Sequence, residues 1–104
     1  MEVTFISKRI AQLRMLKDVS ARDMSLSIGQ ANNYISNIEN EKALPSIQGL
    51  FYICEYFDIS LKDFFDEENK SPALLNALIK EAKVLTPKAL EHCLGLIHEL
   101  KEKG

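Results

Sequence analysis

Residues 20–46 read SARDMSLSIGQANNYISNIENEKALPS, and the first part of this stretch predicts a short helix that ends at a turn. Ser20 and Asp23 have the spacing of a capping box, in which the serine side chain satisfies a backbone N–H at the helix start. Gly29 marks the end of this helix, because glycine adopts the left-handed conformation of a helix C-terminus without steric cost. The stretch therefore begins with a short capped helix and a tight turn.

A second short helix, over about 31–40, is predicted by Ile35 and Ile38, which lie three residues apart and share one side. Its outward side carries asparagine at positions 32, 33 and 37. Asparagine is a mediocre helix former, because its amide competes with the backbone for hydrogen bonds. Capping a helix start needs one asparagine and does not account for another inside the helix. These asparagines therefore indicate a function other than helix formation.

The other segments predict further helices and no strand, because they lack alternating β-branched residues and hairpin turns. Capping residues, among them Ser60 with Asp63, and apolar spacing place these helices at about 4–17, 46–57, 61–65, 72–85 and 87–103. The side chains expected to face the core are Ile6, Ile10, Leu13 and Leu16 in the first helix, Ile47, Leu50, Phe51, Cys54 and Phe57 in the helix that Ser46 opens, and Leu61, Phe64 and Phe65 in the next.

The composition changes at the polar stretch DEENKSP, residues 66–72. We therefore expect a domain over 1–66, a linker over 67–71 and a helical hairpin over 72–104. A threonine cap and a proline at 86–87 separate the two helices of the hairpin. The second of them has heptad-like apolar spacing at Leu90, Leu94, Ile97 and Leu100.

Composition is typical of a soluble globular protein: 104 residues, 46% hydrophobic and 27% charged. No apolar stretch approaches the ~20 residues of a membrane span, and the N-terminus lacks the layout of a secretion signal. Cys54 and Cys93 lie in apolar helical patterns, which predicts two reduced, buried thiols and a cytoplasmic protein. The net charge is −2, with the acidic excess in residues 58–68, so the chain lacks the basic surplus usual in nucleic-acid binders.

Two short helices joined by a glycine-containing turn form the helix-turn-helix arrangement. Residues 6–65 resemble the Cro/C1-type (Xre-like) helix-turn-helix transcriptional regulators without a gap. ISKRIAQLRMLKDVS resembles the family's first helix, MSLSIGQANNYISNIENEKALPS its turn, recognition helix and following loop, and LFYICEYFDISLKDFF its last two helices. The resemblance implies an all-α fold with a five-helix lambda-repressor-like DNA-binding domain, here followed by a C-terminal two-helix hairpin.

In helix-turn-helix complexes the second helix of the motif lies in the major groove of double-stranded DNA. An asparagine amide both donates and accepts hydrogen bonds, so it matches N6 and N7 of adenine. The family's reading positions imply base contacts from Asn32, Asn33 and Asn37, and Ser36 shares their face.

Phosphate contacts position a protein on DNA without reading sequence. The candidates for such contacts are Ala21, Arg22, Tyr34, Asn40, Lys42 and Ser46. Many relatives carry glutamine where this chain has Ala21, so only its backbone N–H is left to approach a phosphate. Arg22 either substitutes for that glutamine or is a solvated surface residue. The Tyr34 ring either packs in the core or brings its hydroxyl to a phosphate.

The family pattern also implies a largely buried ion pair between Arg14, in the first helix, and Glu39, at the end of the recognition helix. The alternative is two exposed charges that contribute almost nothing to stability.

Residue spacing argues against metal and cofactor sites. His92 and His98 are six residues apart and therefore lie on different sides of a helix, while Cys93 belongs to the apolar stripe. The sequence has no glycine-rich phosphate loop and no nucleophile motif, so we expect neither a cofactor nor an enzyme.

The sequence thus predicts a sequence-specific DNA-binding transcriptional regulator, with repression the commoner outcome in the family. We expect it to bind a pseudo-palindromic operator as a homodimer, with the interface formed by Leu90, Leu94, Ile97 and Leu100. The alternative for the hairpin is that it folds back on its own chain. The alternative function is a protein-interaction module, an antitoxin or anti-repressor, whose partner is a co-regulator or a toxin. The acidic pI, Ala21 and the long apolar hairpin favour that alternative.

Overall fold

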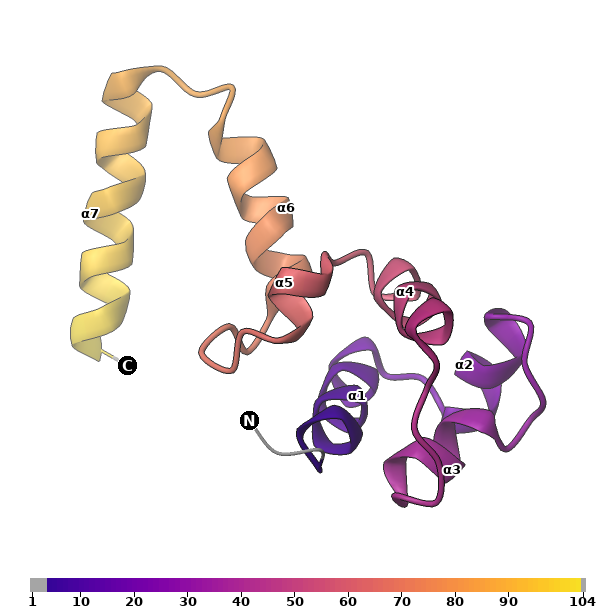
Figure 1. The fold of residues 1–104 in the computed structure, drawn as a ribbon. Helices are drawn as coiled ribbons and strands as arrows, with labels where there is room; N and C mark the ends of the chain where they lie inside the picture. The colour runs from indigo at the N-terminus through magenta and orange to yellow at the C-terminus, as the bar shows by residue number, and fades with distance from the viewer. Residues whose placement is uncertain (1–3, 104) are drawn as a thin grey trace. The chain divides into compact units, whose positions relative to one another are not determined.

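The computed structural model describes residues 4–103, which form two compact units, residues 4–73 and 74–103 (Figure 1). The described residues form seven helices and no strand, so the expected all-α class is confirmed. The helices are α1 (Thr4–Lys17), α2 (Ala21–Ser27), α3 (Tyr34–Glu39), α4 (Ile47–Tyr56), α5 (Leu61–Phe64), α6 (Pro72–Ala82) and α7 (Pro87–Lys103).

Three helices of the first unit begin with the same serine cap. The side chains of Ser20, Ser46 and Ser60 each accept a hydrogen bond, at 3.0 Å, from the backbone N–H three residues further on. Each cap satisfies one of the N–H groups that have no partner inside a helix. The predicted starts of α2, α4 and α5 are therefore confirmed.

The first four helices also end in a common way, with one residue in the left-handed conformation. These residues are Asp18, Gly29, Glu41 and Asp58, with φ between 55° and 76°. In each case the N–H of the following residue bonds to the carbonyl five positions earlier, at 2.8 to 3.3 Å, which is the Schellman motif. Of these four residues only Gly29 predicted a helix end from the sequence. Aspartate and glutamate tolerate the left-handed conformation but do not favour it, so they do not indicate it.

The core of the first unit is formed by side chains from α1 to α5. Its buried hydrophobic members are Ile10, Leu13, Met24, Ile35, Ile38, Ile53, Cys54, Phe57, Ile59 and Phe64. Phe5 stacks on Phe65 with ring centroids 5.9 Å apart and meets Phe64 edge-on at 6.3 Å. The core therefore holds α3 from behind, through Ile35 and Ile38, and leaves its other side accessible.

Three side chains expected in the core are exposed instead: Leu16 is 56% exposed, Ile47 77% and Phe51 54%. In α4 the buried side is centred on Ile53, and Phe51 points about 200° away from it around the helix. Gln48 and Glu55 lie on the side of α4 away from Ile53, and Ile47 and Phe51 lie between that polar side and the buried side. Packing against the other helices decides how far the buried side extends.

Two helices are shorter than predicted. The recognition helix α3 begins at Tyr34 and not near residue 31, because residues 31–33 form a turn in which the Tyr34 N–H bonds to the Ala31 carbonyl at 3.0 Å. The α6 helix ends at Ala82 and not at Leu85. Helix α1 spans 4–17 as predicted.

A buried arginine ties α1 to the end of α5. Arg9 is only 2% exposed, and its guanidinium donates to the carbonyls of Phe64 and Asp63, both at 2.7 Å, and of Asp66 at 3.2 Å. A further bond at 2.9 Å reaches Gln12 Oε1. Burial lowers the pKa of Arg9, and the charges of Asp66 and Asp63 oppose that shift. The arginine thus binds the carbonyls at the end of α5 and in the turn that follows it.

The second unit exposes most of its apolar side chains. Helix α7 has no buried residue, and Leu90, Leu94, Ile97 and Leu100 are all exposed. The Thr86 side chain accepts from the Ala89 N–H at 3.2 Å, as expected for the start of α7. Of the two thiols expected to be buried, Cys54 is buried and Cys93 only half-buried. Within residues 4–103, the structure contains no helix of the length and apolarity that crossing a membrane requires.

Candidate DNA-binding site

Helices α2 and α3 pack against each other across the turn that contains Gly29, and α3 also packs against α1. Met24 of α2 and both isoleucines of α3 are fully buried between these helices. The arrangement holds a six-residue helix that has no stability of its own, because isolated helices this short do not form in water. The motif is therefore a helix-turn-helix in which the tertiary core fixes α3.

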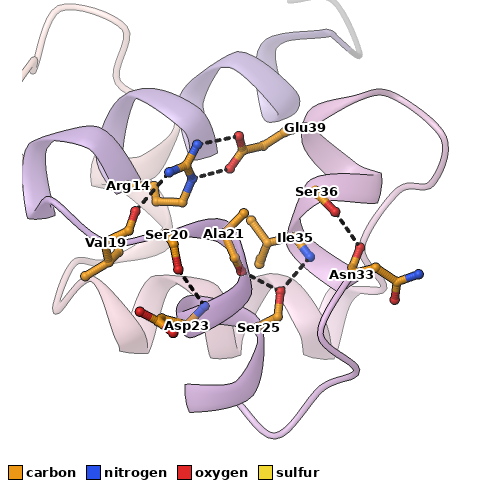
Figure 2. A network of polar contacts seen from close by, with 10 residues as sticks. All are labelled: Arg14, Val19, Ser20, Ala21, Asp23, Ser25, Asn33, Ile35, Ser36 and Glu39. Carbon is orange, nitrogen blue, oxygen red and sulfur yellow. Dashed lines mark hydrogen bonds and ion pairs between the residues drawn. The ribbon is translucent and has the colours of Figure 1, made fainter.

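The four predicted base-contacting residues lie at the start and on the first turn of α3. Asn32 and Asn33 are exposed in the turn before the helix, while Ser36 and Asn37 are half-buried on the helix itself. The Asn33 carbonyl accepts from the Asn37 N–H at 3.0 Å and from the Ser36 hydroxyl at 3.1 Å. Asn33 occupies the N-cap position, yet its side chain makes no capping bond. Its carboxamide points away from the polar network in Figure 2.

The predicted phosphate contacts flank α3 in the chain. Ala21 and Arg22 form the first turn of α2, where Arg22 is exposed and Ala21 is half-buried against the core. Asn40 caps the end of α3, and Lys42 is exposed in the loop that follows. Ser46 is exposed and caps α4, so its oxygen accepts one bond while its hydrogen is available to donate.

Tyr34 packs against the core with its ring, and its hydroxyl lies at the first turn of α4. A Cβ atom added at Gly49 would overlap this hydroxyl and would come within 3.2 Å of Ser46 Oγ. Burial raises the pKa of Tyr34. The two sequence interpretations of Tyr34 are therefore compatible, because a packed ring brings the hydroxyl next to the α4 cap.

The structure brings Arg14 and Glu39 together in a two-pronged ion pair. Arg14 Nε is 2.7 Å from Glu39 Oε2, and Nη2 is 2.9 Å from Oε1 (Figure 2). The remaining guanidinium nitrogen donates to the Val19 carbonyl at 2.9 Å. The side chains are 19% and 13% exposed, and the hydrogen bond to Glu39 raises the pKa of Arg14. This pair fastens the end of α3 to α1 and to the loop before α2.

Sequence reasoning missed Ser25, a fully buried serine on α2. Its hydroxyl donates to the Ala21 carbonyl at 2.7 Å and accepts from the Ile35 N–H at 2.9 Å (Figure 2). The sequence feature that could have predicted its role is a small polar residue directly after Met24, on the side of α2 that faces the core. Such a residue has to find hydrogen-bond partners inside the protein.

Between Thr4 and Lys103, no group of three or more His, Cys, Asp and Glu side chains is arranged to hold a metal ion. The amides of Asn32 and Asn33, exposed directly before a short and firmly held helix, are suited to contact with a polar surface that presents both donors and acceptors.

A family model described as helix-turn-helix matches residues 10–64, just over half of the chain. The HTH-type transcriptional regulator PuuR of Escherichia coli (strain K12) is 32% identical over 63 residues, which are 61% of this chain and 34% of that protein. The regulator of the same name from Shigella flexneri matches equally well. The chain therefore spans about a third of the length of the curated relatives it matches. No solved structure matches. With the matched residues covering α2, its turn and α3, the chain belongs to the Cro/C1-type helix-turn-helix family.

Proposed function

We propose that this protein is a transcriptional regulator that binds a specific DNA operator by placing α3 in the major groove. Membership of the helix-turn-helix family and similarity to a named transcriptional regulator support DNA binding in general terms. The observation that carries sequence-specific binding is the exposed Asn33 side chain, which sits at a helix N-cap without capping the helix.

Asn33 and Asn37 are one helical turn apart, and the backbone bond between them keeps their separation fixed. Side chains with this spacing reach neighbouring base pairs of the groove, where each amide donates to and accepts from an adenine edge. Asn32 and Ser36 adjoin them and complete the base-reading set. The buried isoleucines on the opposite side of α3 prevent the helix from rolling away from the groove.

The phosphate contacts come from the two ends of the motif. Lys42, Asn40 and Ser46 follow α3, and Arg22 with the Ala21 backbone N–H opens α2. Tyr34 adds its hydroxyl beside Ser46. Because only two of these residues carry a positive charge, few counterions are released, and affinity falls less steeply with salt than for a basic repressor.

Binding as a homodimer supplies the second recognition helix that a single short module lacks. In a two-fold dimer the two α3 helices lie about 34 Å apart, one turn of duplex, so the operator is pseudo-palindromic. The exposed residues Leu90, Leu94, Ile97 and Leu100 of α7 form the dimer interface, with coiled-coil spacing. A dimer seated on its operator excludes polymerase, and the outcome is repression.

A second candidate function is a protein-interaction module of the same fold, an antitoxin or anti-repressor. The exposed apolar residues of the second unit favour it, together with the net charge of −2. In that case the α6 and α7 surface binds a toxin or co-regulator, and DNA affinity is weak and insensitive to sequence.

Selection of bound duplexes from a random pool, followed by sequencing, tests the proposal. We expect the protein to enrich a two-fold symmetric sequence. Replacing Asn33 by Ala then relaxes the preference at one position of each half-site and costs about 1–3 kcal/mol there. Lys42→Ala is the matched control, since it weakens binding to all sequences alike. An unchanged sequence preference in Asn33→Ala would show that Asn33 does not read a base, and failure to enrich any sequence would favour the protein-interaction function.

A further inference from the structure

The recognition helix α3 starts differently from the other helices of the first unit. Helices α2, α4 and α5 each begin with a serine whose side chain accepts from a backbone N–H of the first turn. In α3 the corresponding position is Asn33, which has a strong intrinsic preference for capping but makes no side-chain cap. The first N–H groups of α3 therefore need another partner, because a buried donor without one is costly.

Ser25 of α2 supplies that partner from ten residues upstream. Its hydroxyl oxygen accepts from the N–H of Ile35, the second residue of α3, at 2.9 Å. A local cap usually serves the N–H at this second position or the next one. Both Ser25 and Ile35 are fully buried, so water does not compete for the bond. Ser25 thus acts as the cap of α3 although it belongs to the preceding helix.

The orientation of this hydroxyl is fixed. Its single proton is donated to the Ala21 carbonyl at 2.7 Å, so the lone pairs face away from α2, toward α3. The bond to Ile35 therefore has one geometry, which sets where α3 begins relative to α2. Figure 2 shows this chain of bonds from Ala21 through Ser25 to Ile35, with the Asn33 carboxamide on the other side of the helix start.

We propose that Ser25 is a positioning residue for DNA readout: by capping α3 from α2, it leaves the Asn33 side chain exposed and available to a base. This inference rests on the proposed function, in which Asn33 contacts DNA. Without the Ser25 hydroxyl, the Ile35 N–H loses its partner. Asn33 has φ −103° and ψ 7°, whereas the capping serines of α2, α4 and α5 have an extended backbone with ψ between 156° and 167°. Loss of the Ser25 bond therefore lets Asn33 change to the extended conformation, in which its carboxamide turns inward and replaces that bond.

The DNA test uses the full chain and compares Ser25→Ala, Asn33→Ala and the double variant by selection and sequencing. We expect Ser25→Ala to lose base preference at the same operator position as Asn33→Ala. At that position the ratio of affinities for the preferred base and for the other bases should fall by roughly 5- to 150-fold. The double variant loses no more at that position than either single variant. Affinity for a non-specific duplex at the same salt concentration stays within about twofold, since the phosphate contacts are unchanged.

Two variants separate positioning from stability. Ser25→Thr keeps the hydroxyl but adds a methyl group at a fully buried site, so it lowers the melting temperature and preserves the base preference. Ser27→Ala removes an exposed serine of the same helix and changes neither property. If Ser25 were purely structural, base preference would follow stability alone. Ser25→Thr would then lose base preference as its melting temperature falls, and Ser25→Ala would lose base preference only in proportion to its own loss of stability.

Amide hydrogen exchange of the DNA-free protein tests the cap independently of the proposed function. We expect Ser25→Ala to leave the Ile35 amide protected through Asn33, and Ser25→Ala/Asn33→Ala to lose that protection. If the Ile35 amide is as well protected in the double variant as in Ser27→Ala, Ser25 is not the cap, and the inference fails whatever Asn33 does.

The DNA selection separates the remaining outcomes. If Asn33→Ala changes the selected sequence while a folded Ser25→Ala does not, the positioning role is wrong and the proposed function stands. If Asn33→Ala leaves the selected sequence unchanged, the assignment of Asn33 as a base reader is wrong, and the positioning role falls with it.

Discussion

The hydroxyl of Tyr34, at the start of the recognition helix, occupies the space in which a side chain at Gly49 would begin. Gly49 lies in the first turn of α4 and donates its N–H to the Ser46 cap at 3.0 Å. The contact therefore couples the position of α3 to the start of α4, two elements that both contribute proposed DNA contacts. Glycine is needed here for close approach and not for an unusual backbone conformation.

Gly49→Ala is expected to have opposite effects on stability in two backgrounds. In the wild type, overlap with Tyr34 costs about 1–3 kcal/mol and outweighs the gain of about 1 kcal/mol in helix propensity. In Tyr34→Phe the overlapping oxygen is absent, so the same substitution stabilises the protein. Denaturant unfolding of the four proteins in this double-mutant cycle measures the coupling. Equal effects of Gly49→Ala in both backgrounds would show that Tyr34 moves aside freely.

Glu39→Ala is expected to lower the melting temperature by several degrees in the absence of DNA. The substitution leaves the Arg14 guanidinium, only 19% exposed, without its carboxylate partner, at a cost of about 2–3 kcal/mol. Glu41→Ala is the matched control, because Glu41 is exposed and two residues away. Equal melting temperatures for the two variants would mean that the pair contributes nothing to stability.

Arg9→Lys is expected to destabilise the first unit by about 2–4 kcal/mol although it keeps the positive charge. A lysine ammonium cannot reproduce the planar guanidinium that serves the carbonyls of Asp63, Phe64 and Asp66 together. The end of α5 should then open locally, and limited proteolysis within residues 65–72 should become faster. Lys8→Ala, at an exposed neighbouring position, should leave both properties unchanged. Unaltered cleavage in Arg9→Lys would contradict the anchoring role.

Cys54 is expected to resist thiol reagents in the folded protein. Burial raises its pKa to about 11, so at pH 8 only about one molecule in a thousand carries the reactive thiolate. Labelling in a Cys93→Ser background, followed by mass spectrometry, should show modification only in denaturant. Rapid labelling of the folded protein would mean that the core opens often.

The same raised pKa makes stability depend on pH. The folded state holds the Cys54 proton more tightly than the unfolded state, whose thiol has its ordinary pKa of 9.0. The unfolded state therefore binds fewer protons between these values, and the free energy of unfolding falls as pH rises from 9 toward 11. Cys54→Ala should lack this part of the alkaline loss, which denaturant titrations at pH 8 and pH 10.5 would compare.

The proposed homodimer should sediment at close to twice the chain mass of 11.8 kDa at micromolar concentration. Ile97→Asp introduces a charge into the α7 interface and should return the protein to the monomer mass. His92→Asp is the matched control, because His92 lies on the side of α7 opposite Leu90, Leu94 and Ile97, and its replacement should leave the dimer intact. A single wild-type species of the monomer mass would rule out the dimer.

Features that depend on local chemistry could be predicted from the sequence. Three helix starts were predicted by Ser20, Ser46 and Ser60, since a cap acts on N–H groups two or three residues away in the chain. Gly29 predicted a helix end, because the left-handed conformation depends on the residue itself. The motif formed by these signals led to the correct family and to the correct fold class.

Features that depend on partners far away in the chain followed from tertiary packing. The extent of the buried side of α4, which leaves Ile47 and Phe51 exposed, followed from packing against the other helices and not from the spacing of its own apolar residues. The start of α3 was misplaced by three residues, because residues 31–33 form a turn and the second N–H of the helix bonds to Ser25 of another helix. Local patterns fix what a segment can form, whereas the hydrogen bonds and burial that pick one outcome come from residues far away in the chain.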